Sequence, residues 1–368
     1  MRTFRTSAVF SCLALALGVA ACGGDEEEGG GAAGGGEQTE EVSGTIAGAG
    51  ASSQAAAMEA WIVGFQDMNP GATVSYDPVG SGGGREQFVA GGTDFGGTDA
   101  ALDDEELEGA QERCGQVIQL PGYVSPIAIA YNLPDVENLQ LSPQTLASIF
   151  AQDITNWNDP AIARDNPDAQ LPDGRITVVN RSDESGTTEN FVEYMFEVAP
   201  DIWDFEVSGD WPVPGGEAAD GTSGVVDAIQ AGEGAIGYAD ASQVGDLGVA
   251  RIGVGQEFVE PSAEAAAKIL EASEREDRGG EFFFSYDLRR DTTESGTYPI
   301  VLVSYELACT QYDNQQTAEV VQAFMEYVIS PEGQQAAAEN AGSAPISDSL
   351  RQQLQPAVDA ISAGGAAG

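Results

Sequence analysis

Short β-like runs alternate with segments of helical periodicity along most of this chain, and this alternation constrains the fold more than any other feature. The sequence predicts strands at 45–47, 73–76, 94–96, 124–131, 176–179, 235–238 and 298–308, and helices at 52–65, 84–90, 143–150, 185–196, 224–231 and 317–329. Helices interleaved with strands are typical of α/β proteins, whose sheets are largely parallel. We therefore expect an α/β fold with mostly parallel sheets flanked by helices.

The N-terminus has the pattern of a secretory signal peptide. Arg2 and Arg5 precede an apolar run at 8–21, which is too short to span a bilayer. The run ends in Val-Ala-Ala-Cys at 19–22, which resembles the lipobox of bacterial lipoproteins and implies cleavage before Cys22 and a lipid on its thiol. An ordinary signal peptide with an incidental cysteine is the alternative. We favour the lipoprotein, because small residues lead directly into the cysteine.

A flexible tether follows the predicted signal peptide at 1–21. Residues 22–43 combine glycines with an acidic cluster, Asp25 to Glu28, and show no apolar period. Such a composition cannot bury a core, so the folded part would move about a lipid anchor on the outer face of the cell membrane. The sequence has no second long apolar run, and we expect no further membrane-spanning segment.

The charge of the chain argues against several partners. It has 60 acidic and 14 basic residues, and Lys268 is the only lysine. Without Arg2 and Arg5 the mature chain keeps 12 basic residues and a net charge of −48. Such a surface repels nucleic acids and anionic membranes, so we expect neither as a partner.

Histidine is absent from the sequence. This absence removes Ser-His-Asp and Cys-His catalytic arrangements and all imidazole metal sites. The chain also lacks a G-x-S-x-G motif and a carboxylate cluster suited to two metal ions, which argues against a phosphatase or serine hydrolase. We therefore expect a protein that is not an enzyme and needs neither a metal nor a cofactor.

Two of the four cysteines have a predicted fate. Cys12 lies in the signal peptide, and Cys22 is the predicted lipidation site. The remaining pair, Cys114 and Cys309, could form a disulfide in an oxidising compartment. The sequence alone does not show whether these two approach each other.

Three turns rich in small and hydroxyl residues stand where helices are predicted to begin. They read GAGASSQ at 48–54, GSGGGR at 80–85 and RSDESGTT at 181–188. A helix N-terminus offers unpaired backbone N–H groups and a partial positive charge, which together suit an anion. Each turn alone could be an ordinary N-cap, but three in one chain favour an anion-binding pocket.

The same turns belong to a series of motifs by which the chain, from about Gly44 to Ser347, resembles the phosphate-binding protein of bacterial Pst-type phosphate ABC transporters. In sequence order the motifs are GAGAS at 48–52, residues 76–84, DFGGTD at 94–99, ITNWNDP at 154–160, residues 181–187 and GAIGY at 234–238. The resemblance implies a two-domain clamp of the periplasmic-binding-protein type (class II). Each domain would be a mixed, mostly parallel sheet flanked by helices, and the ligand would not be chemically changed.

The resemblance also implies domain boundaries and partners. Residues 44–122 and 296–363 would form one discontinuous domain and residues 123–295 the other. Inorganic phosphate would bind in the cleft between them and close it. The protein, a monomer, would then deliver phosphate to the permease subunits of an ABC importer.

Carried over residue by residue, the resemblance assigns eight phosphate-binding positions, which are Ser52, Ser53, Ser81, Asp99, Arg181, Ser185, Gly186 and Thr187. Ser52 and Ser81 would donate their hydroxyls, and Ser53 its backbone N–H. Asp99 would be the single carboxylate that faces the ligand and Arg181 the only arginine. The last three positions would supply donors at the start of the third helix.

Asp99 has a physical role in this scheme. Phosphate at neutral pH still carries a proton that an ionised carboxylate can accept, whereas sulfate carries none. A buried carboxylate that faces a sulfate oxygen with no proton between them costs several kcal/mol, which corresponds to roughly a thousandfold in affinity. Asp99 would therefore select phosphate over sulfate. Arg181 could pair with a phosphate edge in bidentate fashion. The alternative for Asp99 is that it caps a helix beginning near Leu102.

Two positions depart from the family pattern. Ser53 replaces the usual aromatic residue, which would leave the pocket rim wetter, and Glu184 replaces a common glycine. We expect Asp183 and Glu184 either to pair with Arg181 or to point to solvent. Arg85 could be a second cation near the ligand or face solvent; we expect it to orient Asp99 through a salt bridge.

Two further uses of the same fold stay open. Arsenate nearly matches phosphate in shape and protonation, so the chain could be an arsenate binder. It could also be a surface sensor that feeds a signalling partner in place of a permease.

Overall fold

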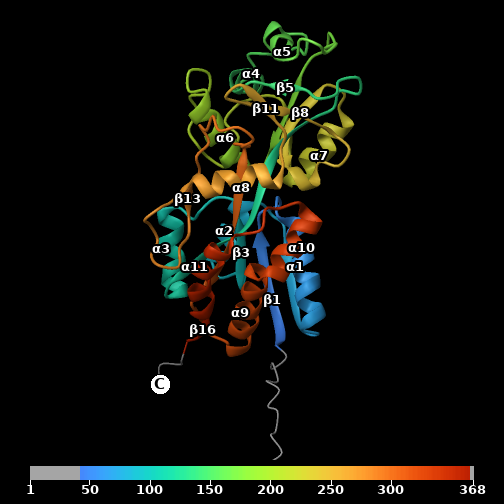
Figure 1. Cartoon of the computed structure of the whole chain (residues 1–368). Coiled ribbons are helices and arrows are strands. Elements are labelled where there is room, and N and C mark those ends of the chain that lie inside the picture. Colours follow the sequence, from blue (N-terminus) through green and yellow to red (C-terminus); the bar gives the residue numbers. More distant parts are fainter. Residues whose placement is uncertain (1–41, 365–368) are drawn as a thin grey trace, which may run out of the picture. The chain divides into compact units, whose positions relative to one another are not determined.

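The computed structural model describes residues 42–364, whose arrangement is shown in Figure 1. The predicted signal peptide, Cys22 and the tether up to residue 41 lie outside the described residues. Across 42–364, every helix is too short or too polar to cross a membrane. Helices and strands alternate through most of this part, as the sequence predicts.

A nine-stranded mixed sheet is the largest element of the fold. Its strand order is β2 (Gly71–Asp77), β1 (Ser43–Gly50), β3 (Phe95–Thr98), β14 (Val301–Cys309), β4 (Val117–Tyr131), β8 (Ala235–Asp240), β6 (Thr177–Arg181) and β7 (Glu217–Ala219), with β9 (Gly248–Val249) also paired to β4. The pairs of β1 with β2 and β3 are parallel, as are those of β6 with β7 and β8. β14 and β4 pair antiparallel with each other and with their outer neighbours. The expected parallel pairing therefore describes the outer strands, while the centre is antiparallel.

The two central strands, β4 and β14, are buried along their whole length. β4 pairs with β14 over 117–126 and with β8 over 127–131. Strands covered on both faces are nearly continuous apolar runs, which is the pattern that predicts them in the sequence. The predicted domain boundary at residue 122 falls inside β4, and the division into two domains stays a prediction.

Helices flank the sheet on both sides of these central strands. Within residues 42–364 they are α1 (Ala55–Met68), α2 (Ser81–Val89), α3 (Asp104–Cys114), α4 (Pro143–Phe150), α5 (Pro160–Asp165), α6 (Gly186–Val198), α7 (Gly221–Ala231), α8 (Ala263–Ala272), α9 (Gln315–Ile329), α10 (Pro331–Ala341) and α11 (Asp348–Asp359). Helices α2 and α9 pack against β1, α1 packs against β2, α2 also packs against β3, and α7 packs against β6 and β8.

Three small sheets complete the described part. They join β5 (Gln140–Leu141) to β10 (Arg251–Val254) and β11 (Glu257–Val259), β12 (Glu274–Arg275) to β13 (Tyr286–Asp287), and β15 (Gln311–Tyr312) to β16 (Ser362–Ala363).

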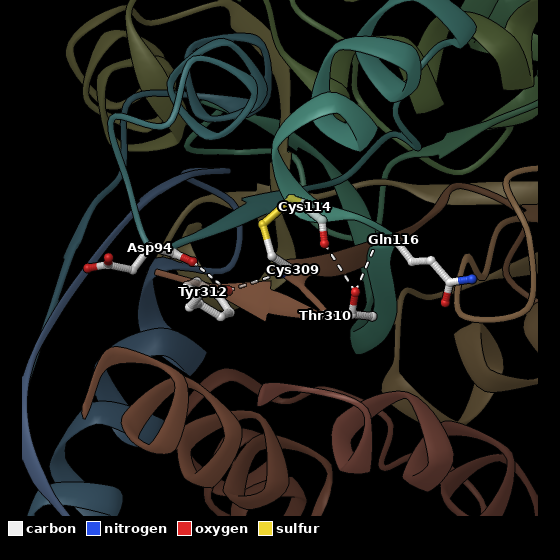
Figure 2. The surroundings of a disulfide bond; sticks show 6 residues. All are labelled: Asp94, Cys114, Gln116, Cys309, Thr310 and Tyr312. Carbon is white, nitrogen blue, oxygen red and sulfur yellow. Dashed lines mark hydrogen bonds between the residues drawn. A yellow bond between two sulfur atoms is a disulfide. The ribbon is translucent and has the colours of Figure 1, made fainter. Parts of the chain in front are cut away.

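Cys114 and Cys309 form a disulfide between the last residue of α3 and the last residue of β14 (Figure 2). Their Cα atoms are 4.5 Å apart, although 195 residues separate them in sequence. Beside the disulfide, Thr310 Oγ1 donates to the Cys114 carbonyl at 3.1 Å, and Tyr312 Oη donates to the Asp94 carbonyl at 2.8 Å. A covalent closure of so long a loop restricts the unfolded chain and so favours the folded one.

Candidate functional site

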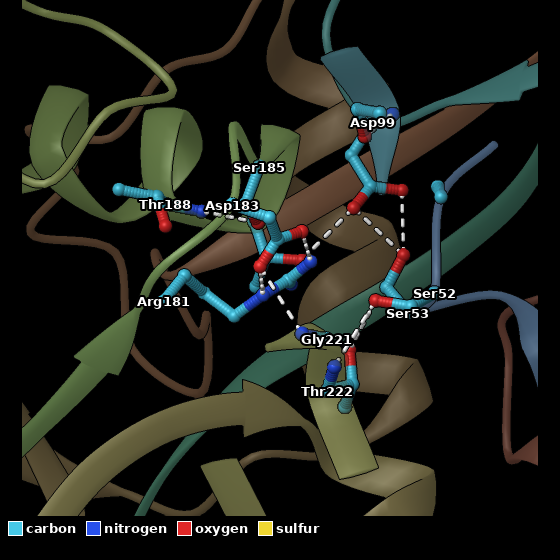
Figure 3. A network of polar contacts seen from close by, with 12 residues as sticks. Ser52, Ser53, Asp99, Arg181, Asp183, Ser185, Thr188, Gly221 and Thr222 are labelled. Carbon is cyan, nitrogen blue, oxygen red and sulfur yellow. Dashed lines mark hydrogen bonds and ion pairs between the residues drawn. The ribbon is translucent and has the colours of Figure 1, made fainter. Parts of the chain in front are cut away.

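The three predicted turns meet around Asp99, which follows β3 and is 3% exposed. Ser53 Oγ lies 2.7 Å from each carboxylate oxygen, Ser304 Oγ donates to Oδ1 at 2.6 Å, and Thr187 Oγ1 donates to Oδ2 at 2.9 Å. Figure 3 shows Asp99 facing the turn of Ser52 and Ser53. Burial raises the pKa of Asp99, and the hydroxyl donors and Arg181 offset this effect only in part.

The first turn connects β1 to α1, and both of its serines are buried. Ser52 Oγ lies 3.0 Å from Thr222 Oγ1 and accepts the backbone N–H of Thr222 at 3.1 Å. Gln243 Nε2 donates to the carbonyls of Ser52 and Ser53 at 2.9 and 2.7 Å. Ser53 is 0% exposed, so the expectation of a wetter rim at this position is wrong: its hydroxyl is used inside the cluster.

The second and third turns meet at Gly186. Ser81, the first residue of α2, accepts the backbone N–H of Asp99 at 3.1 Å. Gly186 begins α6, and a Cβ added to it would lie 2.7 Å from both Asp99 Cβ and Ser81 Oγ. Any side chain at this position would clash, so glycine is what allows the start of α6 to approach Asp99.

Helix capping distinguishes these turns from one another. Ser185 caps α6 by accepting the Thr188 N–H at 3.3 Å. At the starts of α1, α2 and α7, by contrast, the described residues provide no side-chain cap. The hydroxyls of Ser52, Ser53 and Ser81 bind other partners, so ordinary N-capping does not explain the first two turns. The N–H groups at these helix starts are suited to hold an anion.

Asp99 itself is not a helix cap. The helix that follows it, α3, begins at Asp104 and has Asp103 as its N-cap. Asp103 accepts the Glu106 N–H at 2.7 Å, and Glu106 accepts the Asp103 N–H at 3.0 Å, which completes a capping box. The capping alternative for Asp99 is therefore excluded.

Arg181 ends β6 and is 3% exposed. Its Nε donates to Asp183 Oδ1 at 2.7 Å and its Nη2 pairs with Asp183 Oδ2, as Figure 3 shows. Asp183 also accepts the Gly221 N–H at 3.1 Å. Burial opposes ionisation of Asp183, but the hydrogen bonds and charge of Arg181 outweigh it and hold the pKa of Asp183 below its usual value. Asp183 was expected either to pair with Arg181 or to point to solvent, and the structure shows it paired with Arg181.

Arg85 does not orient Asp99 through a salt bridge, and that expectation is wrong. Its Nε donates to Glu106 at 2.8 Å and its Nη2 to Glu184 at 2.6 Å. Nη1 reaches Thr98 Oγ1 at 3.3 Å. Two carboxylates close to one guanidinium outcompete Asp99, whose oxygens are already bound by hydroxyls. Glu184, within the third turn, is thus paired with Arg85 and not with Arg181.

Several polar residues of the cluster are not among the predicted positions; they are Asn190, Thr222, Tyr238, Gln243 and Ser304. Thr222 had a usable signal, because Gly-Thr-Ser-Gly at 221–224 follows the same pattern as the predicted turns. Ser304 had another, since a hydroxyl inside a strand buried on both faces needs a partner. Asn190 and Gln243 gave no comparable signal, because amides at these positions are common on helix surfaces.

The cluster combines hydroxyl and N–H donors, the ion pair of Arg181 with Asp183, and the carboxylate of Asp99. This set can hold an anion that itself carries a proton, because Asp99 can accept that proton while the other groups donate. Within residues 42–364 there is no group of histidine, cysteine, aspartate and glutamate side chains arranged to hold a metal ion.

Comparisons with known proteins identify relatives of this chain. A family model described as a PBP superfamily domain matches residues 35–332. Phosphate-binding protein PstS 3 of Mycobacterium tuberculosis is 36% identical over 371 residues, which cover 98% of this chain and all of that protein. Phosphate-binding protein PstS of Haemophilus influenzae is 31% identical over 304 residues, or 80% of this chain and 87% of that protein.

A solved structure agrees in fold. A high affinity periplasmic phosphate-binding protein (PfluDING), bound with phosphate, has a TM-score of 0.71 and 23% sequence identity, covering 85% of this chain and 93% of that chain. This likeness confirms the expected periplasmic-binding-protein-like α/β fold.

Proposed function

Because this chain belongs to the family of Pst-type phosphate-binding proteins, we propose that it binds inorganic phosphate outside the cytoplasm and delivers it to the permease subunits of an ABC importer. Phosphate would be bound and released unchanged. The signal peptide would direct export, and after its cleavage the lipid on Cys22 would keep the protein, a monomer, at the outer face of the membrane.

The observation that carries the proposal is the buried carboxylate of Asp99 among hydroxyl donors, next to uncapped helix starts. A buried carboxylate is a costly group to place where an anion binds, unless the anion brings a proton. Phosphate brings one at neutral pH, and its P–OH would replace one of the hydroxyls that now donate to Asp99. The displaced hydroxyl, of Ser53 or Thr187, could then turn to a phosphate oxygen.

The remaining phosphate oxygens would be held mainly by neutral donors. The N–H groups at the starts of α1, α2 and α6 would supply hydrogen bonds and the positive ends of three helix dipoles. Arg181 uses Nε and Nη2 for Asp183, so phosphate would approach its Nη1. Since Asp183 offsets the charge of Arg181, specificity would come from hydrogen-bond geometry more than from net charge.

The contacts at Gly186 support binding between two domains. Asp99 and Ser81 belong to the predicted domain 44–122, and Gly186 belongs to the predicted domain 123–295. Their close approach is the contact that a closed cleft would need, with phosphate bound by both domains at once.

Calorimetric titration tests the proposal. The protein without residues 1–22, stripped of ligand, is titrated with phosphate, then with sulfate, and separately with arsenate. We expect one-to-one phosphate binding at micromolar affinity or tighter and no heat with sulfate. A protein that binds neither anion would contradict the proposal, and tighter binding of arsenate than of phosphate would redirect it to arsenate.

A further inference from the structure

The side-chain amide of Asn190 connects the start of α6 to Asp99. It is 6% exposed, and its Nδ2 donates to the carbonyls of Asp99 and Gly186, each at 2.8 Å. Both hydrogens of this amide are therefore used. One side chain holds together two backbone segments that each carry a proposed phosphate contact.

A buried arginine fixes the direction of this amide. Arg290 is 1% exposed; its Nη2 donates to Asn190 Oδ1, its Nη1 to the Val301 carbonyl at 2.9 Å, and its Nε to Glu193 at 2.8 Å. An arginine can only donate, so Asn190 must turn its oxygen to Arg290 and its N–H groups to the two carbonyls. Arg290 is in turn held by α6 and by the start of β14.

The two N–H bonds of Asn190 differ in what they connect. Gly186 lies one helical turn before Asn190, and both belong to the predicted domain 123–295, as does Arg290. Asp99 belongs to the predicted domain 44–122. Of the two N–H bonds, only the one to the Asp99 carbonyl joins the two predicted domains, and it would break when the cleft opens. Arg290 also bonds across the predicted boundary, to Val301 of the segment 296–363, but its pairing with Glu193 of its own predicted domain would keep the amide in position.

We infer that Asn190, positioned by Arg290, is a latch of the closed state that slows the release of phosphate. The inference rests on the proposed function. Asn190 bonds to the backbone carbonyl of Asp99 and not to its carboxylate, so it is a positioning residue. A latch made only after closure affects the dissociation rate and leaves the encounter with phosphate unchanged.

A matched pair of variants separates the latch from ordinary packing. Asn166 is 7% exposed, and its Nδ2 likewise donates to a carbonyl one turn back, of Ile162 at 2.9 Å, and to a distant one, of Gln140 at 2.7 Å. It lies in the segment after α5, outside the cluster around Asp99. Asn190→Ala and Asn166→Ala therefore remove the same kind of contact in two places.

The measurements are the association and dissociation rates of radiolabelled phosphate, together with thermal unfolding of each ligand-free variant. Loss of one buried hydrogen bond is expected to speed dissociation from Asn190→Ala about five- to tenfold, with association changed by less than about twofold. Asn166→Ala should release phosphate at the rate of the unmodified protein, although both variants lose stability. An unchanged dissociation rate in Asn190→Ala would overturn the latch.

Two further variants test the latch if Asn190→Ala does not fold, and test the positioning role of Arg290. Asn190→Ser can still bond the Gly186 carbonyl one turn back but does not reach Asp99, so it should also release phosphate faster. Arg290→Lys keeps the charge without the planar fork and should act in the same direction; an unchanged rate would overturn the positioning role. If the unmodified protein binds no phosphate, the proposed function fails, whereas normal binding with unchanged variants refutes the latch alone.

Discussion

Asp99 and Glu306 are buried carboxyl groups close to the same strand, and their surroundings differ. Asp99 accepts hydrogen bonds from three hydroxyls, one of them from Ser304 on β14. Glu306, two residues further along β14, is 0% exposed, and no residue in the described part donates to either of its oxygens. Burial, followed by the charge of Asp99, raises the pKa of Glu306 to about 8. Glu306 is therefore mostly neutral at pH 7.

The surroundings of Gln54 fit a neutral Glu306. Gln54 Nε2 donates to Tyr76 Oη at 3.1 Å, and Tyr76 in turn donates to the Ala51 carbonyl at 3.1 Å. Gln54 Oε1 is buried and, among the described residues, has no donor; a protonated Glu306 nearby can supply one. The comparison teaches that burial beside another carboxylate yields a neutral acid, and that hydroxyl donors and Arg181 are what favour ionisation at Asp99.

Asp99→Asn should have the largest effect of the substitutions that test the difference between Asp99 and Glu306. An amide can donate to sulfate, and it no longer requires a proton from the ligand. The preference for phosphate over sulfate should therefore fall by roughly a thousandfold, as measured by calorimetric titration with both anions. Glu306→Gln serves as the control, because it changes the neighbouring carboxyl and should keep the preference. An Asp99→Asn protein with the original preference would remove Asp99 from its proposed role.

Glu306→Gln should change the pH dependence of stability. In the folded protein Glu306 keeps its proton up to about pH 8, whereas the unfolded chain loses it near the ordinary value of about 4.5. The unmodified protein thus loses stability as the pH rises between these values, by up to about 1.4 kcal/mol per pH unit. Glu306→Gln removes this loss, so it should gain about 3 kcal/mol over the unmodified protein between pH 4.5 and pH 7 in urea unfolding.

Asp240 provides a matched control for that measurement. It is also 0% exposed, but Tyr123 donates to it at 3.1 Å and the Ser242 backbone at 2.9 Å. Burial raises the pKa of Asp240 to about 6, so the gain of Asp240→Asn should level off near pH 6. If the stability gain of Glu306→Gln also levelled off near pH 6, hydrogen-bond donors would not account for a difference in pKa between Glu306 and Asp240.

Much of the fold could be predicted because apolar periodicity and burial agree along the chain. The run at 298–308 becomes β14, and the helix predicted at 143–150 has the bounds of α4. Helices α3 and α11 were not predicted, because charged and amide residues dominate them and few of their side chains are buried. The antiparallel centre of the sheet was also missed, since strand direction depends on which distant segments pair.

The site was predictable where it follows from local backbone chemistry. The turns at Ser52, Ser81 and Ser185 are visible in sequence because glycine and hydroxyl residues precede each helix. The partner of Arg85 was not, because Glu106 and Glu184 approach it from different elements. Pairings of this kind are decided by tertiary packing, which one sequence does not reveal.

Ser304→Ala should make Asp99 more like Glu306, with fewer hydrogen-bond donors and a higher pKa. It removes a donor to Asp99 Oδ1 at 2.6 Å, and loss of a buried hydrogen bond to a charged group costs about 1.5–3 kcal/mol in the free energy of unfolding. The pKa of Asp99 should rise further, because the ionised form loses a partner. As the pH is lowered from 7, phosphate binding by Ser304→Ala should therefore begin to weaken at a higher pH than binding by the unmodified protein. At pH 7 the two affinities should differ little.

Titrations with phosphate across the acidic range measure this shift. Ser125→Ala is its control, because Ser125 is equally buried on β4 and pairs with Leu302 in the sheet, without a hydrogen bond to Asp99. It should lose stability without shifting the pH profile of binding. If the profiles of Ser304→Ala and the unmodified protein coincide, the hydroxyls do not set the ionisation of Asp99. The difference between Asp99 and Glu306 would then have to come from the charge of Arg181, which lies near one carboxylate and not the other.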